Sequence, residues 1–179
     1  MSTEDYWLIE PAEDLGEEYL AYGEEFRAAG EPYVHGELAK VGGDFTRLLA
    51  GWQDEAAGRN LPPDWVPCTR YWLVRGRRII GTSRLRHWLT PALEDAGGHI
   101  GYDVRPSERD KGHATRLLAM TLEEARELGL HRVLLTCDAD NLASRRVIEK
   151  NGGRLASQGT SRRDGKPLLR FWIDLVKTT

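Results

Sequence analysis

A strand–turn–helix–strand–helix run over residues 99–153 limits the fold of this chain more than any other feature. Residues 99–104 have the pattern of a strand, and residues 114–128 carry apolar side chains at helical spacing before Gly129. A second strand-like segment, 131–137, leads into a helix that ends near Gly152. A strand–helix–strand unit of this length implies parallel strands joined by a right-handed crossover.

The turn over residues 105–113 has the composition of an anion site. Gly112 lets a ligand approach the backbone closely, and the helix that follows begins with N–H groups that lack acceptors. The cations of this segment are Arg105, Arg109, Lys111 and Arg116. We predict that main-chain donors and flexible cations of this turn together hold a phosphate group. A surface turn with solvated cations is the alternative interpretation.

Two segments carry a family resemblance. Residues 109–114 fit Arg/Gln-x-x-Gly-x-Gly/Ala, and residues 141–153 fit Asn-x-x-Ser followed by a helix that closes on Glu-Lys-x-Gly. In this context they resemble the signatures of the GNAT-type N-acetyltransferase superfamily. The resemblance implies that the pantetheine arm of acetyl-CoA lies between two splayed central strands. The cofactor-binding residues it indicates are Val104, Arg105, Arg109, Asp110, Lys111, Gly112, His113, Ala114, Thr115, Asn141 and Ser144. Asn141 also suits a helix N-cap.

The order of elements predicts an α/β (α+β) fold. Residues 6–9 fit a strand, residues 12–29 and 42–57 fit helices, and hairpins are expected over 71–83 and 155–173. The pattern indicates a mixed sheet with helices on its faces. The resemblance implies a single mixed, mostly antiparallel, twisted sheet with about four helices, the GNAT-like acyl-CoA N-acyltransferase fold. One such domain is expected over residues 1–179.

Composition narrows the function classes. The net charge of −3 disfavours nucleic-acid binding, and no apolar stretch approaches the length of a membrane helix. Two cysteines, Cys68 and Cys137, indicate a reducing compartment and form no metal-binding pattern. The acidic start is not a signal peptide. We therefore expect a cytoplasmic protein without a metal or a membrane partner.

The predicted activity is an acetyl-CoA-dependent N-acetyltransferase. It would move the acetyl group to a primary amine of a small molecule or peptide, by direct attack in a ternary complex; a homodimer is a possible assembly. His99 and His87 are the candidate bases, because histidine titrates near neutral pH, although either could be structural. His35 is a third candidate. Asp103 shares a strand face with His99 and could contribute.

The general acid is the point at which the sequence departs from the family pattern. The position where many members carry a tyrosine is Ile148, which cannot donate a proton. Tyr102 or Tyr33 could substitute, or the thiolate could leave unassisted. The resemblance also implies that a backbone N–H near residues 102–105 binds the oxyanion. The missing tyrosine leaves a non-catalytic acyl-CoA-binding sensor module as the alternative function.

Overall fold

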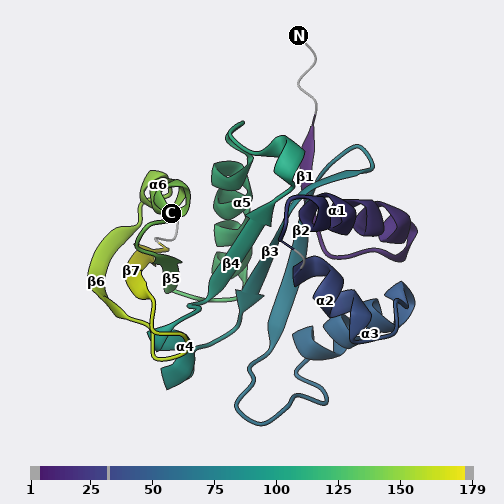
Figure 1. Cartoon of the computed structure of the whole chain (residues 1–179). Coiled ribbons are helices and arrows are strands. Elements are labelled where there is room, and N and C mark those ends of the chain that lie inside the picture. The colour runs from purple at the N-terminus through teal and green to yellow at the C-terminus, as the bar shows by residue number, and fades with distance from the viewer. Residues whose placement is uncertain (1–4, 32, 176–179) are drawn as a thin grey trace.

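The computed structural model describes residues 5–31 and 33–175, without the side chains of residues 33–35. The elements are β1 (Tyr6–Ile9), η1 (Glu13–Leu15), α1 (Gly16–Ala28), α2 (Tyr33–Ala39), α3 (Phe45–Ala56), β2 (Cys68–Arg75), β3 (Arg78–Arg86), α4 (Pro91–Asp95), β4 (Ile100–Val104), η2 (Pro106–Glu108), α5 (His113–Glu127), β5 (Arg132–Asp138), α6 (Leu142–Lys150), β6 (Arg154–Thr160) and β7 (Pro167–Asp174). The helices α1–α3 lie on one side of the molecule, and the strands β5–β7 lie on the other (Figure 1).

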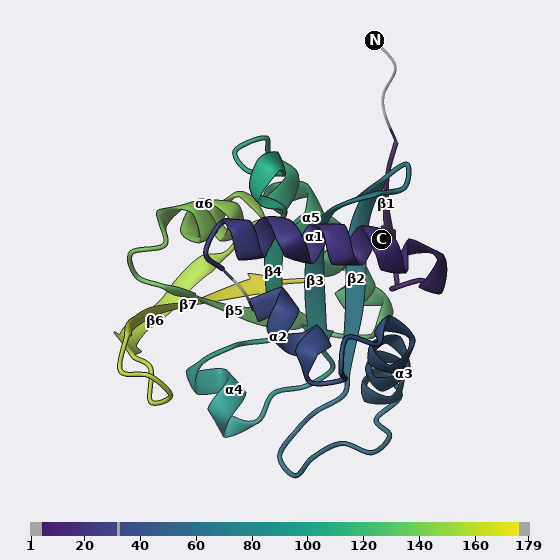
Figure 2. The ribbon, with the colours of Figure 1, turned by 45° about the vertical axis from the view of Figure 1, so that its right-hand side comes forward.

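The first four strands form an antiparallel sheet in the order β1-β2-β3-β4. Helices α1, α2 and α3 cover one face of this sheet, and α5 packs behind it (Figure 2). Alternation along β3 separates the two faces. Ser83 points to the α5 side, where its hydroxyl lies 2.7 Å from that of Thr121. Thr82 and Arg84 therefore project to the side of the N-terminal helices.

Aromatic side chains fix the N-terminal helices to this sheet. Tyr19 of α1 stacks on Trp72 of β2 with ring centroids 5.3 Å apart, and Trp52 of α3 meets both rings edge-on. Helix α3 begins at Asp44, whose carboxylate accepts a hydrogen bond from the Arg47 N–H at 3.1 Å. Rings of this size contribute about 1.5–3 kcal/mol each when buried. The cluster also forms one wall of a cavity described below.

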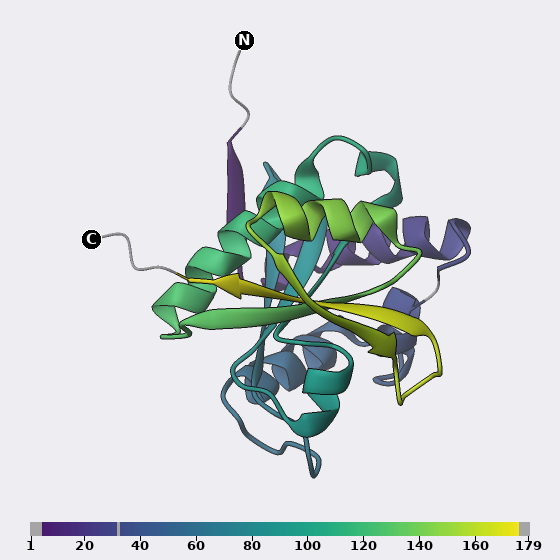
Figure 3. The ribbon, with the colours of Figure 1, turned by 90° about the vertical axis from the view of Figure 1, so that its left-hand side faces the viewer.

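The last three strands form a second antiparallel sheet in the order β5-β7-β6 (Figure 3). The apolar face of α5 packs between this sheet and the first, through side chains such as Leu118 and Leu122. Phe171 of β7 and Ile148 of α6 lie in the same core. Helix α5 therefore joins the two sheets through one hydrophobic cluster.

The two sheets meet at a single backbone junction. The His99 N–H donates to the Leu134 carbonyl at 2.7 Å, and the His99 Nδ1 atom accepts from the Leu134 N–H at 2.9 Å. Gly98 is required here, because a Cβ atom at that position would lie 2.3 Å from the Leu134 oxygen. Beyond this junction, β4 and β5 share no ladder, and each is the edge strand of its sheet. A gap between two strand edges is thus built into the fold.

The predicted fold class is confirmed, with differences in detail. Six α-helices are present in the described residues, where about four were expected. The additional ones are α2 and α4, which have only 7 and 5 residues and lie in segments for which no helix was predicted. The strands form two hydrogen-bonded sheets instead of one, and the expected parallel pairing of β4 with β5 is reduced to the junction at His99.

Candidate active site

The turn between β4 and α5 presents a row of free backbone donors. Asp110 and Gly112 adopt positive φ angles of 61° and 83°, which bends the chain back so that successive N–H groups converge. In the described part of the chain, none of the amides of residues 110–115 donates to a protein acceptor. Gly112 is the N-cap of α5, so the positive end of the helix dipole adds to these donors. The arrangement is an anion site.

A cavity of about 690 Å³ extends from this turn to the start of α6. Its volume lies within the range typical of small-molecule sites. The residues predicted to bind the cofactor that line it are Val104, Arg109, Asp110, Gly112, His113, Ala114, Thr115, Asn141 and Ser144. Arg105 and Lys111 do not line it. The structure therefore brings nine of the eleven predicted binding residues to one cavity.

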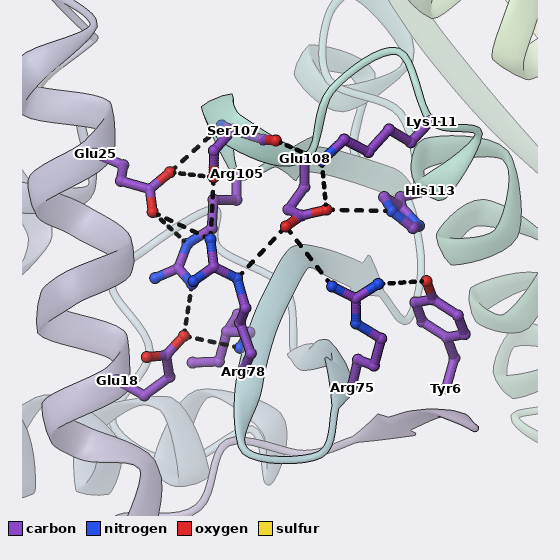
Figure 4. Close-up of polar contacts among 11 residues, drawn as sticks. Tyr6, Glu18, Glu25, Arg75, Arg78, Arg105, Ser107, Glu108, Lys111 and His113 are labelled. Atoms are coloured by element: carbon purple, nitrogen blue, oxygen red, sulfur yellow. Dashed lines mark hydrogen bonds and ion pairs between the residues drawn. The ribbon is translucent and has the colours of Figure 1, made fainter. Parts of the chain in front are cut away.

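Arg105 is part of the scaffold beneath the turn. Its side chain is 1% exposed, and its guanidinium lies 2.7 Å from Glu18 and 3.2 Å from Glu25 of α1 (Figure 4). The charge of this buried cation is thus neutralised by two carboxylates of the protein itself. This geometry favours a structural role for Arg105 over the predicted contact with phosphate.

Glu108 holds the underside of the turn. Its carboxylate lies 3.0 Å from Lys111 and 3.5 Å from the His113 ring, and two arginines of the β2–β3 hairpin approach it from the other side (Figure 4). Burial opposes its ionisation, yet the Lys111 hydrogen bond and the arginines hold the pKa of Glu108 below its ordinary value. The His113 ring is directed into this network, so the residue faces the cavity mouth with its backbone.

Arg109 connects the turn to the end of α1. Its guanidinium makes two hydrogen bonds to Glu31, of 2.8 and 2.9 Å, and a third to the Val104 carbonyl at 3.1 Å. These bonds hold the pKa of the Glu31 carboxyl below its ordinary value. Since the pair is partly exposed and lines the cavity, an incoming phosphate can compete with Glu31 for the guanidinium.

The opposite wall of the cavity is the start of α6. The Asn141 side chain caps this helix by accepting the Ser144 N–H at 3.0 Å. The Tyr102 hydroxyl, from β4, lies 2.9 Å from the Ser144 hydroxyl. Burial raises the pKa of Tyr102 to about 12, so this hydroxyl stays protonated. Ile148, at the position where the resemblance expects a tyrosine, is fully buried in the core.

A second cavity lies on the other face of the first sheet, and Asp103 lines both. This smaller cavity measures about 20 Å³, room for about one water molecule. Its walls are Tyr19, Glu37, Trp52, Arg70, Trp72, Thr82, Ser83, Arg84 and Asp103. The Asp103 carboxylate accepts hydrogen bonds from the Tyr22 hydroxyl and, at 3.0 Å, from Thr82. In the described residues, Asp103 alone reaches both cavities.

The predicted base His99 is placed at the junction of the two sheets. It is 6% exposed, and burial, aided by Arg86, lowers its pKa to about 4. Its Nδ1 lone pair is taken by the Leu134 N–H, so the ring proton resides on Nε2. Neither nitrogen is available to accept a proton from a substrate. This geometry favours a structural role for His99.

The second predicted base, His87, follows the end of β3 that lies farthest from the turn. It is five residues from Thr82, the cross-strand partner of Asp103, or roughly 17 Å along the strand. Its Nε2 atom lies 2.9 Å from the Thr69 hydroxyl, and burial lowers its pKa. His87 lines neither of the two cavities. The side chains of His35 and Tyr33 lie outside the described residues.

Arg84, Thr82 and Tyr19, which line the smaller cavity, belong to no motif that marks them in the sequence. The available signal was strand alternation, which places Arg84 and Thr82 on one face of the predicted hairpin. That pattern does not predict which face of the sheet the N-terminal helices cover. Strand alternation did place Asp103 on the face of His99, as a residue that could contribute to the chemistry.

No helix in the described residues combines the length and apolarity needed to cross a bilayer. The same residues contain no cluster of three or more His, Cys, Asp or Glu side chains placed to bind a metal ion. Both cysteines, Cys68 and Cys137, are buried and free.

Two central strands that separate beside an anion-binding turn are the arrangement that the sequence resemblance implied, although the strands form two hydrogen-bonded sheets. Comparison with known families agrees: the family described as acetyltransferase (GNAT) domain matches residues 12–154. This chain therefore belongs to the GNAT acetyltransferase family.

The match to an individual curated relative covers only part of the chain. The uncharacterized N-acetyltransferase YnaD of Bacillus subtilis (strain 168) is 38% identical over 56 residues, which span 31% of this chain and 33% of the relative. The matched segment thus covers about a third of that curated protein.

Solved structures match over nearly the whole chain. The ribosomal-protein-S5-alanine acetyltransferase from Vibrio fischeri has a TM-score of 0.69 at 15% identity, covering 100% of this chain and 98% of that one. The yncA protein from Salmonella typhimurium, solved with its cofactor acetyl-CoA, has a TM-score of 0.63 at 16% identity, covering 97% and 96%. At such identities the likeness shows the shared fold.

Proposed function

We propose that this protein transfers the acetyl group of acetyl-CoA to a primary amine by direct attack in a ternary complex. The observation that carries the proposal is the row of unoccupied amides at residues 110–115, at the head of a cavity of about 690 Å³. Acetyl-CoA carries a pyrophosphate, and convergent main-chain donors at a helix start are suited to it. A fold relative solved with acetyl-CoA and a relative named as an N-acetyltransferase support the assignment.

The donor would occupy the larger cavity. Amides of residues 110–115 hold the pyrophosphate, and Arg109, released from Glu31, meets a further phosphate oxygen. When bound, acetyl-CoA supplies the activated thioester. The amide of Arg105 donates to Ile80 on β3, so by alternation the amides of Tyr102 and Val104 point to the unpaired edge of β4. These edge amides are the donors available for a carbonyl oxygen that gains negative charge.

The acceptor would approach from the smaller cavity. Asp103 presents its carboxylate there, fixed by hydroxyl donors from Tyr22 and Thr82. A fixed carboxylate binds an ammonium group and accepts the proton that the nitrogen must lose before it attacks. Asp103 takes the role of general base, which was predicted for His99 or His87, because it alone among described residues lines both cavities.

Departure of the thiolate is assisted at Tyr102. With a pKa of about 12, its hydroxyl is a weaker acid than a thiol of pKa about 8.5, so complete proton transfer to the sulfur is uphill. Tyr102 therefore acts as a hydrogen-bond donor to the leaving sulfur, in place of its bond to Ser144. The absence of a tyrosine at Ile148 then no longer favours a non-catalytic acyl-CoA sensor.

The test is a pair of glycine substitutions. Gly112 and Gly165 both have positive φ angles, of 83° and 73°, and a Cβ atom at either would meet nothing within 4 Å. Gly112→Asp and Gly165→Asp thus introduce similar backbone strain and the same charge. We expect acetyl-CoA binding, measured by calorimetry, to fall by more than about 100-fold only in Gly112→Asp, through repulsion of the phosphates. Equal affinities in the two variants would contradict the proposal.

A further inference from the structure

The charges that face the smaller cavity are unequally satisfied. Arg70 and Arg84 are cross-strand neighbours on β2 and β3, an arrangement that is unfavourable for two cations. Arg70 is neutralised by an ion pair with Glu55, by a second with Glu37 at 3.4 Å, and by contact with the Trp52 ring. Its guanidinium is therefore committed to the protein.

Arg84 has no such partner. Among the described residues, no carboxylate, carbonyl or hydroxyl lies within hydrogen-bond distance of its guanidinium, although the side chain is half-buried and lines the cavity. Its cross-strand neighbour on β4 is Gly101, and a Cβ atom there would lie 3.7 Å from the guanidinium. The absence of a side chain at Gly101 leaves that part of β4 open beside a free cation.

Asp103, a carboxylate on the same face of the sheet, forms no ion pair with Arg84 in the described structure. Asp103 pairs across the strands with Thr82, two residues from Arg84, so their Cα atoms are diagonal neighbours roughly 7–8 Å apart. The Asp103 carboxylate is instead turned to Tyr22 and Thr82. The cavity thus presents Asp103 and Arg84 to a ligand, beside the ion pair of Glu37 and Arg70 that also lines it.

We infer that the acceptor is a primary amine that carries a carboxylate near its nitrogen, with the ammonium at Asp103 and the carboxylate at Arg84. This inference rests on the proposed function and specifies its substrate class. The spacing fits a group whose nitrogen and carboxylate are a few bonds apart, since each charge reaches its partner through one hydrogen bond. Because Arg84 is half-buried, the carboxylate meets it at the open edge while only the nitrogen enters the narrow part. A planar guanidinium binds such a carboxylate through two parallel hydrogen bonds.

The experiment compares acceptors that differ only in the carboxylate. One pair is L-alanine and L-alaninamide, and the other is the tripeptides Asp-Ala-Gly and Asn-Ala-Gly, with acetyl-CoA as donor. We expect kcat/KM to be higher by roughly tenfold or more for the charged member of at least one pair, as loss of a charged hydrogen bond predicts. Preference within the first pair indicates a free amino acid, and preference within the second indicates an acidic peptide N-terminus.

Substitutions assign that preference to Arg84. Arg84→Met should lower kcat/KM for the charged acceptors, relative to kcat/KM for the matched amides, by roughly tenfold or more, while Arg84→Lys restores part of the loss. Arg77→Met is the matched control, since Arg77 is 72% exposed in the β2–β3 turn and, among the described residues, pairs only with Asp14. Thermal unfolding checks that each variant is folded.

The outcomes separate this inference from the proposed function. Equal turnover of both members of each pair, or an equal effect of Arg84→Met on both, would overturn the inference while acetyl transfer stands. Acetyl-CoA binding with no turnover of any panel amine would also overturn it, since the charged acceptors are in the panel. Absence of acetyl-CoA binding by the parent protein would remove the proposed function itself.

Discussion

Acidification should weaken the junction between β4 and β5, because His99 must then bind a proton that its position disfavours. The His99 Nδ1 atom accepts a hydrogen bond from the Leu134 N–H, and the ring is 6% exposed. Protonation of Nδ1 replaces this acceptor with a donor that faces another donor. Burial first, and Arg86 second, lower the pKa of His99 from 6.5 to about 4.

The size of the effect follows from linkage. In the folded state the pKa of His99 lies below its unfolded value, so its contribution to stability is complete above pH 6.5 and is lost as the pH falls towards 4. A pKa difference between about 6.5 and about 4 corresponds to a loss of about 2 kcal/mol at pH 5 and about 3 kcal/mol below pH 4. In a protein whose total stability is about 5–15 kcal/mol, such a loss is measurable.

The assay is urea unfolding at pH 7.5 and pH 5.0 for the parent and His99→Asn. The side-chain oxygen that this substitution introduces takes the place of Nδ1, accepts the Leu134 N–H and does not titrate. Carboxylates such as Glu108 and Glu31 weaken both proteins alike as the pH falls, so the quantity of interest is the difference between the two. We expect the parent to lose about 2 kcal/mol more than the variant. His131→Asn, at an exposed position, should behave as the parent. Parallel losses in the parent and His99→Asn would refute the reasoning.

Three further substitutions test the site. Asp103→Asn, which can still accept from Tyr22 and Thr82, should lower kcat/KM for the amine roughly 100-fold and leave acetyl-CoA affinity unchanged in calorimetry; unchanged kinetics would exclude Asp103 as proton acceptor. Tyr102→Phe should reduce kcat roughly tenfold, the value of one hydrogen bond to the leaving sulfur, with little change in the KM for acetyl-CoA. Arg105→Met should destabilise the fold by roughly 3 kcal/mol in urea, because Glu18 loses its cation and Glu25 keeps only Arg78; a loss of acetyl-CoA affinity at unchanged stability would instead indicate a contact with phosphate.

Much of the architecture could be predicted from local patterns. The helical spacing of Leu117, Leu118 and Leu122 and the strand before Gly112 are signals carried by short stretches of chain. The short helix α2 was not predicted, because its 7 residues include Gly36 and complete only about two turns. In the structure, α2 contacts α1 and α3.

The part of the candidate site proposed for acetyl-CoA was predictable from the sequence, and the part proposed for the amine was not. The turn at Gly112 and the cap at Asn141 act through their own backbone, so their sequence spacing was informative. Roles that depend on distant partners were not accessible in this way. Arg105 and Arg109 are both arginines of the same turn and look equivalent in the sequence. In the structure Arg105 is buried against α1, whereas Arg109 lines the larger cavity.

The sequence by itself determined the order of strands and helices, the glycine-bearing turn and the chemistry of the amides that follow it, because these properties arise from neighbouring residues. Only the tertiary structure decided that β4 and β5 meet at His99 and then separate. It also decided that Asp103 faces both cavities and that Arg84, on the same face, has no ion-pair partner within the described residues. The physical reason is that burial, partnering and the sharing of a cavity depend on which distant segments pack together, and side-chain type does not specify that packing.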